Sequence, residues 1–372
     1  MFKNSLTIIK VSGIPIRLHI SFLLILPFFA FAIGNNITEI AHMAQVPPDS
    51  LALNPYWLGL IIAIFLFISV AMHELSHSLA ARSRGIGIKD ITLMLLGGVA
   101  QLEEDSMPPR DEAIMAIAGP LFSLILGLSL LFILRPLTFD INPDLSLIVY
   151  YLGYINIFLA LFNLLPAFPS DGGRILRSLI ASKTSHLRAT QIATFIGKTF
   201  AFFFGFVGLL YGQILLVLIA FFIYISANQE YKINQLRDAF SDFTVADLMS
   251  EEVIAVKQDI TIQELLELMI KEKHTGYPVI NEEGELIGCV TMEDTDKIEI
   301  KDKERQSIKE IMTCEVITAK PDEPLFDAFI KMSKADIGRL VVMEQGEMVG
   351  ILTRSDIMKA YKLKSIQQKS MN

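Results

Sequence analysis

The stretch His73-Glu74-Leu75-Ser76-His77 lies inside an apolar run long enough to cross a membrane. On a helix, residues four apart share one face, so His73 and His77 can bind one zinc ion together, with Glu74 placed to act as general base. Ionisable groups are costly at bilayer depth and are rarely kept there without a function. The stretch therefore predicts a membrane helix with a metal-dependent hydrolytic centre. The alternative, two histidines reaching for water at a helix end, leaves Glu74 unexplained.

The composition divides the chain into an apolar part and an acidic part. The chain has 372 residues, which is too long for one domain. Of these residues 52% are hydrophobic, a composition too apolar for a soluble globular protein. Residues 1–243 carry 15 basic and 15 acidic side chains, whereas residues 244–372 carry 17 and 25, so the net charge of −8 arises entirely in the last third. We expect a soluble acidic module there, and no basic patch indicates nucleic acid as a partner.

Two further features bear on the compartment of each part. The N-terminal apolar run has no evident cleavage site, so we expect a retained first span rather than a removed signal. The two cysteines, Cys289 and Cys314, lie in separate apolar segments of the acidic part. We expect reduced core residues of a cytoplasmic domain rather than a disulfide.

Six segments approach the roughly 20 apolar residues that a membrane span needs. They are residues 16–34, 56–81, 112–134, 146–166, 190–208 and 212–228. Loops rich in Lys and Arg alternate with loops that have none, which predicts a multi-pass protein of the cell membrane with both termini cytoplasmic. His73 lies 17 residues after Tyr56, about 26 Å along a helix, and therefore still within the bilayer on its cytoplasmic side.

A catalytic zinc usually has three protein ligands, and the best third candidate is Asp171. It lies in Pro169-Ser170-Asp171-Gly172-Gly173, after the fourth predicted span and at the same cytoplasmic depth as the histidines. Pro166 and Pro169 break the helix, and Gly172 and Gly173 allow a close-packed turn. An ordinary surface loop is the alternative, and the matching depth of the two motifs disfavours it.

The two motifs, in this order and topology, resemble the site-2 protease family of intramembrane zinc metalloproteases over residues 10–230. The resemblance includes the Gly97-Gly98 loop, Ala118-Gly119-Pro120, and the stretch from Asn163 to the Asp-Gly pair. It implies one zinc ion held by His73, His77 and Asp171, with Glu74 as base and Asn163 near the reacting carbonyl. Ser170 departs from the family pattern, which usually has a large apolar residue there.

Two of these roles have structural alternatives. An amide such as that of Asn163 could stabilise an oxyanion, or it could cap a helix end or bond a neighbouring helix. Residues 88–105 are too short and too broken by Gly97 and Gly98 for a span, so we expect a β-like re-entrant loop. Its open edge could pair with an unwound substrate strand, or the loop could simply pack on the helices.

Residues 244–361 contain an internal repeat. Asp247-Leu248-Met249 matches Glu310-Ile311-Met312, and Gly288-Cys289-Val290-Thr291 matches Gly350-Ile351-Leu352-Thr353. Each copy has the pattern strand, helix, two strands, helix, which predicts two similar units packed on one another.

The repeat resembles a tandem pair of CBS domains, which implies clefts for an adenine nucleotide (AMP, ADP or ATP) and possible homodimerisation. The matching positions are Thr291, Asp294, Thr353 and Asp356. The alternative is that each aspartate only caps the helix that follows it.

We therefore expect a multi-span α-helical membrane domain of about six helices followed by an α/β tandem CBS module. The expected parts are a protease domain at 1–240, CBS domains at 244–299 and 307–361, and a disordered tail at 362–372. The expected function is cleavage of membrane proteins in or near their transmembrane segments. The rival functions are a CBS-regulated channel or transporter, for which the membrane part lacks repeated halves, and an inactive protease that only binds clients.

Overall fold

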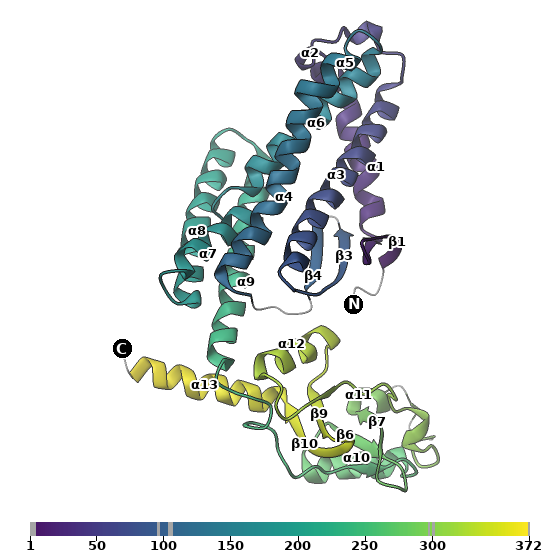
Figure 1. Cartoon of the computed structure of the whole chain (residues 1–372). Helices are drawn as coiled ribbons and strands as arrows, with labels where there is room; N and C mark the ends of the chain where they lie inside the picture. The colour runs from purple at the N-terminus through teal and green to yellow at the C-terminus, as the bar shows by residue number, and fades with distance from the viewer. Residues whose placement is uncertain (1–4, 95–96, 103–106, 297, 300–301, 371–372) are drawn as a thin grey trace. The chain divides into compact units, whose positions relative to one another are not determined.

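The computed structural model describes residues 5–94, 97–102, 107–296, 298–299 and 302–370 (Figure 1). The chain divides into two compact units, Met1–Asn234 and Gln235–Asn372. The first contains the apolar helices and one sheet, and the second contains the two repeats. This arrangement agrees with the expected helical membrane domain followed by an α/β module.

Five helices in the described part of the chain are long and apolar enough to cross a membrane. Three of them begin with proline at the first helical position, where its missing N–H costs nothing. The five spans are α3 (Pro55–Ser83), Pro109–Thr138, α6 (Pro143–Asn163), α8 (His186–Leu210) and α9 (Ile214–Phe240). The second of them comprises α4 (Pro109–Ser129), the π-helical turn η2 (Leu130–Leu134) and α5 (Arg135–Thr138).

The expected span at 16–34 is wrong in its first residues. Ser12 and Gly13 both have positive φ, which is the backbone of a tight hairpin turn joining β1 (Ser5–Val11) and β2 (Ile14–His19). The apolar residues at the start of β2 alternate with less buried ones, so they belong to a strand rather than a helix. The helix α1 (Phe22–Asn35) is accordingly shorter than the five spans, and α2 (Ile37–Met43) and η1 (Pro48–Ser50) follow it.

A four-stranded sheet forms at one end of the helical unit (Figure 1). Its order is β1-β2-β3-β4, in which β2 and β3 (Ile88–Met94) run parallel and β4 (Gly97–Leu102) is antiparallel to β3. The β character expected for 88–105 is confirmed for these strands, while residues 95–96 and 103–106 lie outside the described part. Because β4 is an edge of the sheet as described, one side of its backbone has no strand partner there.

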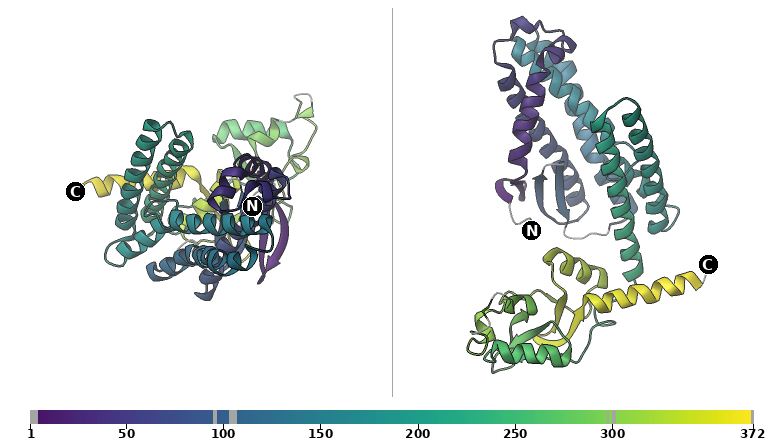
Figure 2. Two further views of the ribbon diagram at one scale, coloured as in Figure 1. Left: turned by 90° about the horizontal axis from the view of Figure 1, so that it is seen from above. Right: turned by 180° about the vertical axis from the view of Figure 1, so that it is seen from behind.

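The last helices of the unit follow α6 through a non-helical loop. The short helix α7 (Asp171–Ala181) comes first. The chain turns between α8 and α9 at Tyr211–Gln213, so the two helices form a hairpin, and these teal-green helices lie side by side in both views of Figure 2. Ala201 of α8 and Ile223 of α9 are buried in one apolar cluster, together with Ala167 of the loop that precedes α7.

The second unit consists of two copies of the predicted pattern. Each has a three-stranded sheet, ordered β5-β6-β7 in one and β10-β9-β8 in the other. The first copy comprises β5 (Val256–Lys257), α10 (Ile262–Glu272), β6 (Gly276–Ile280), β7 (Leu286–Thr291) and α11 (Met292–Thr295). After η4 (Ile308–Glu310), the second comprises β8 (Thr318–Ala319), α12 (Leu325–Ala335), β9 (Arg339–Glu344), β10 (Glu347–Thr353) and α13 (Arg354–Ser370).

The two copies exchange equivalent backbone bridges. Thr313, which precedes the second copy, bridges Cys289 in β7 of the first. Ser250, which precedes the first copy, bridges Ile351 in β10 of the second. Each sheet is thus extended by the segment that leads into the other copy, which explains why the repeats pack as a pair.

The helix α13 extends through Ser370, into the range 362–372 that we expect to be a disordered tail. The Lys364 ammonium group donates to the Asp238 carbonyl (3.3 Å) and to the Asp242 carboxylate (2.8 Å), and it lies over the Phe243 ring. These contacts attach α13 at Lys364 to the end of α9 and the residues that follow it.

The two thiols should differ in reactivity. Cys314 is exposed, whereas burial raises the pKa of the half-buried Cys289 thiol to about 11. Its reactive thiolate is therefore scarce at neutral pH and becomes abundant only as the pH approaches that value. Iodoacetamide at pH 7 should modify Cys314 first, as measured by peptide mass spectrometry, and both thiols should react in urea. Equal labelling of the folded chain would contradict this expectation.

Candidate metal centre

The two histidines come from one helical face of α3. The Asn54 side chain caps this helix by accepting from the Tyr56 N–H, and 29 residues follow without a break. The spacing of four places the His73 and His77 rings together, with their Nε2 atoms 3.2 Å apart. Both rings are buried, at 3% and 8% exposure.

The orientation of both rings is set by α4. The His77 Nδ1 lies 2.7 Å from the Met115 carbonyl oxygen, which can only accept, so Nδ1 carries the proton. The His73 Nδ1 lies 2.9 Å from the Ser123 hydroxyl. These contacts fix the direction of each ring, and where Nδ1 is the donor, the lone pair of Nε2 is free for a metal.

Asp171 reaches the same point from a different element. It is the first residue of α7, and its Oδ2 lies 3.3 Å from the His73 Nε2 and 3.2 Å from the His77 Nε2. Three ligand atoms bound tetrahedrally to one zinc ion lie about 3.3–3.5 Å apart, given bonds of about 2.0–2.2 Å. The observed triangle, with two imidazole nitrogens and a carboxylate oxygen, therefore fits zinc in size and in chemistry.

The loop before Asp171 is held by glycine and serine. A Cβ on Gly172 would lie 2.3 Å from the carbonyl oxygens of Leu164 and Leu165, so only glycine lets α7 fold back so closely onto the end of α6. The Ser170 hydroxyl lies within hydrogen-bond distance of the Leu165 carbonyl (2.6 Å) and the Ala167 carbonyl (2.5 Å). Ser170 thus binds the loop at the position where the family pattern usually has an apolar residue.

The close approach of α4 to the histidines depends on Gly119. A Cβ there would lie 2.2 Å from the His77 Nε2 and 2.7 Å from the His73 Nε2. Ser123, the Met115 carbonyl and the steric role of Gly119 were missed as parts of the site. A spacing of four residues between each of these positions, on one face of a helix, is the signal that could have indicated them.

The predicted base and the predicted substrate loop meet. Glu74 is half-buried, and a Cβ on Gly98 would lie 2.3 Å from the Glu74 Cγ. The edge strand β4 therefore passes directly against the base, beside the histidine pair on α3. Gly97 begins the same strand.

Asn163 is not brought into this cluster by any described contact. Its amide Nδ2 donates to the Leu159 carbonyl of its own helix, at 3.1 Å. This bond lies within its own helix, and the role of Asn163 at a reacting carbonyl stays a prediction.

The Thr–Asp pairs of the second unit form helix caps. The Asp294 Oδ2 accepts from the Thr291 N–H and hydroxyl, at 2.9 and 2.8 Å. Asp356 accepts from Thr353 in the same way. One carboxylate oxygen of each pair is thus engaged in the cap, and nucleotide binding by these residues stays a prediction.

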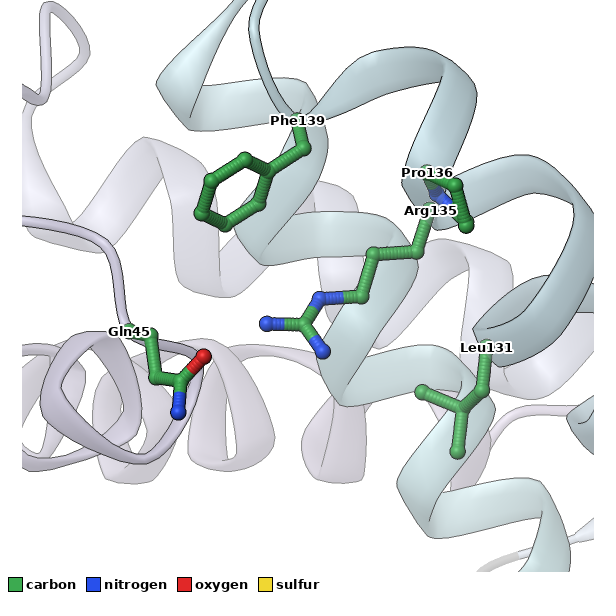
Figure 3. Close-up of a pocket in the computed structure, with 5 residues that line it drawn as sticks. All are labelled: Gln45, Leu131, Arg135, Pro136 and Phe139. Atoms are coloured by element: carbon green, nitrogen blue, oxygen red, sulfur yellow. The ribbon is translucent and has the colours of Figure 1, made fainter.

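A shallow pocket lies at the other end of the helical unit from β3 and β4 (Figure 1). The Arg135 guanidinium there donates to the Ala44 carbonyl (2.7 Å) and lies over the Tyr150 ring. None of the predicted site residues lines this pocket, whose lining residues in Figure 3 are Gln45, Leu131, Arg135, Pro136 and Phe139.

Comparison with known proteins agrees with both units. The model of peptidase family M50 matches residues 61–141 and 139–204, and the CBS domain model matches residues 245–295 and 308–363. A zinc metalloprotease of Methanocaldococcus jannaschii is 35% identical over 364 residues, which cover 98% of each chain.

Two solved structures resemble one unit each. A site-2 protease from Methanocaldococcus jannaschii is 38% identical, covering 61% of this chain and 95% of that chain, with a TM-score of 0.44. The CBS domain pair of protein MJ0100, in complex with 5′-methylthioadenosine and S-adenosyl-L-methionine, is 35% identical, covering 33% and 98%, with a TM-score of 0.31.

The full-length similarity to a zinc metalloprotease extends over both the apolar helices and the repeats. The chain therefore belongs to peptidase family M50, the site-2 protease family of membrane zinc metalloproteases, and it carries a tandem pair of CBS domains.

Proposed function

We propose that His73, His77 and Asp171 bind the zinc ion of an intramembrane endopeptidase and that Glu74 is its general base. The observation that supports this most strongly is the buried triangle of ligand atoms, with sides of 3.2 to 3.3 Å. It lies among helices long enough to cross a membrane. The substrates we propose are membrane proteins, cut in or near their transmembrane segments.

Each residue of the proposed site would then have a separate role in peptide hydrolysis. Bound zinc supplies a Lewis acid that polarises the scissile carbonyl and makes water more acidic. Glu74 accepts the proton of the attacking water and passes it to the leaving amine. Met115 and Ser123 keep the imidazoles directed at the metal. Asn163 could stabilise the oxyanion with the second N–H of its amide, since the first donates to the Leu159 carbonyl.

The edge of β4 offers a way to hold the substrate. A membrane helix resists proteolysis because all its backbone groups are bonded internally, so a segment must unwind before it can be cut. An unwound segment could pair with the β4 backbone by strand addition, which would bring it beside Glu74. We propose Gly97 and Gly98 as part of this substrate contact.

The orientation in the membrane is also a proposal. Loops rich in Lys and Arg support cytoplasmic termini and a cytoplasmic CBS module. We take the membrane domain as 1–240 and the CBS domains as 244–299 and 307–361, and the ranges matched by the family models support these bounds.

We infer that the CBS pair binds an adenine nucleotide and modulates the protease. The equivalent Thr–Asp pairs support this, because in each pair the cap engages one carboxylate oxygen. The other oxygen of Asp294 makes no described bond, and that of Asp356 accepts from the exposed Lys359 ammonium group, which ribose hydroxyls would have to replace or share. The resemblance to CBS pairs also supports a homodimer formed through this module.

Glu74→Gln should keep zinc and abolish proteolysis. The amide preserves the shape of the side chain but cannot accept the proton, so cleavage of a membrane-embedded substrate should fall by at least about a hundredfold. Zinc content, measured by mass spectrometry on the purified chain in detergent, should match wild type. Ser76→Ala on the same helix is the control, since its hydroxyl bonds only the Met72 carbonyl in the described contacts. Wild-type turnover by the zinc-loaded Gln variant would remove Glu74 as base.

Gly119→Ala should lower zinc content in the folded protein. The new methyl group would meet ring atoms of both histidines, which must turn away from their shared point. The matched control is Gly205→Ala in α8, where the nearest contact of a Cβ is Ala220 at 3.5 Å. We expect the control to retain zinc, as measured per folded chain after size exclusion. Full zinc occupancy in the Gly119→Ala variant would refute the close approach of α4 to the histidines.

Titration of AMP, ADP and ATP into the full chain in detergent should give a binding signal by calorimetry for at least one of them. Asp294→Asn combined with Asp356→Asn should weaken it, since an amide accepts fewer ribose hydroxyl bonds. Glu293→Gln, an exposed neighbour of Asp294, is the control and should bind as wild type does. Absence of heat with all three nucleotides would reject the nucleotide proposal and leave the protease unaffected.

A further inference from the structure

A buried arginine lies on the helix that begins with Asp171. Arg177, six residues further along α7, is 8% exposed, and its guanidinium group donates to Glu112 and to Glu230. The guanidinium also lies over the Phe168 ring, 5.1 Å from the ring centre, in the loop just before Asp171. A cation is rarely buried to this extent without a specific partner.

Both carboxylate oxygens of Glu112 accept hydrogen bonds from α7. Arg177 donates to Oε1, and the hydroxyl of the next residue, Ser178, donates to Oε2 at 2.9 Å. Glu112 is itself only 4% exposed. Two successive residues of α7 therefore bind one buried carboxylate, which fixes the helix in both position and rotation.

The helix that carries Glu112 is the one that orients the histidines. On α4, Glu112 precedes Met115 by one helical turn, and Gly119 and Ser123 follow at intervals of four residues. These positions share one face of the helix. Met115 and Ser123 contact the imidazole Nδ1 atoms, and Gly119 lies against the Nε2 atoms. The same face of α4 thus contacts both the histidine pair and the aspartate-bearing helix.

The ligand triangle requires these two parts to stay within about an ångström of their positions. His73 and His77 are held on α3 by α4, whereas Asp171 arrives on α7 after a loop that leaves the fourth span. The loop connects α7 to the end of α6. Among the described ion pairs, the one that connects α7 to α4 is that of Arg177 with Glu112. A shift of α7 along α4 would therefore move the carboxylate away from the nitrogens.

We propose that Arg177 is a positioning residue that, through Glu112, holds Asp171 at the histidine pair and so sets the zinc affinity of the site. This inference rests on the proposed zinc site. Residues that support a metal ligand from the second layer typically change metal affinity by 10- to 100-fold when removed. Glu230, from α9, neutralises the other side of the guanidinium, and its described bonds go to Arg177 and Asn234 rather than to α4.

The test is zinc affinity, measured on the full chain in detergent by competition with a chelator of known affinity. Arg177→Gln and Glu112→Gln should each weaken zinc binding about tenfold. The double variant should be no weaker than the worse single variant, because both changes break one connection. Glu230→Gln should change the affinity by less than about threefold. Arg188→Gln, an exposed arginine on α8, is the matched control and should bind zinc as wild type does.

Zinc affinity separates this role from a purely structural one. Each affinity is measured on the monodisperse folded fraction. If Arg177→Gln does not fold, Glu112→Gln provides the test, because it keeps the size of the side chain. Excess zinc should restore cleavage in the folded variants with an unchanged KM. Wild-type zinc affinity in folded Glu112→Gln, or additive losses in the double variant, would overturn the positioning role. Absence of zinc binding by the wild-type chain would instead overturn the metal site itself.

Discussion

The structure depends on the imidazole rings of His73 and His77, whose nitrogen atoms are buried and must find hydrogen-bond or metal partners within the protein. A buried polar group without a partner costs several kcal/mol in hydrocarbon, about 2–7 by transfer estimates. Here each ring has one nitrogen bonded to α4, through the Met115 carbonyl or the Ser123 hydroxyl, and the other nitrogen pointing at Asp171. This requirement sets the packing of α4 on α3 and allows only glycine at position 119.

The site is assembled from parts that no short stretch of chain could bring together. In the proposed site, α3 would supply two ligands and the base, α4 orients the two imidazoles, and α7 would supply the third ligand after a loop closed by Ser170 and Gly172. The sheet adds the edge of β4 beside Glu74. Rigid elements hold each part, which is what a metal site needs if it is to keep its geometry.

The departures from expectation have local physical causes. The apolar residues from 16 onward were read as one span, because periodicity cannot separate a short buried strand from the start of a helix. The turn at Ser12 and Gly13 decides in favour of the strand. We expect a disordered tail at 362–372, but residues as far as Ser370 belong to α13, in which Lys364 bonds Asp238 and Asp242. In both places tertiary or hairpin contacts overrode composition.

The sequence by itself determined the long apolar helices and the repeat, and it predicted the proposed ligands and base, because spacing of four on a helix, hydropathy and self-similarity are local properties. Only the tertiary structure decided the distances of 3.2 to 3.3 Å among His73, His77 and Asp171. It alone identified Ser123, Gly119 and the pairing of Arg177 with Glu112 as supporting parts. These depend on which faces of distant helices meet, and that is set by packing between residues far apart in the chain.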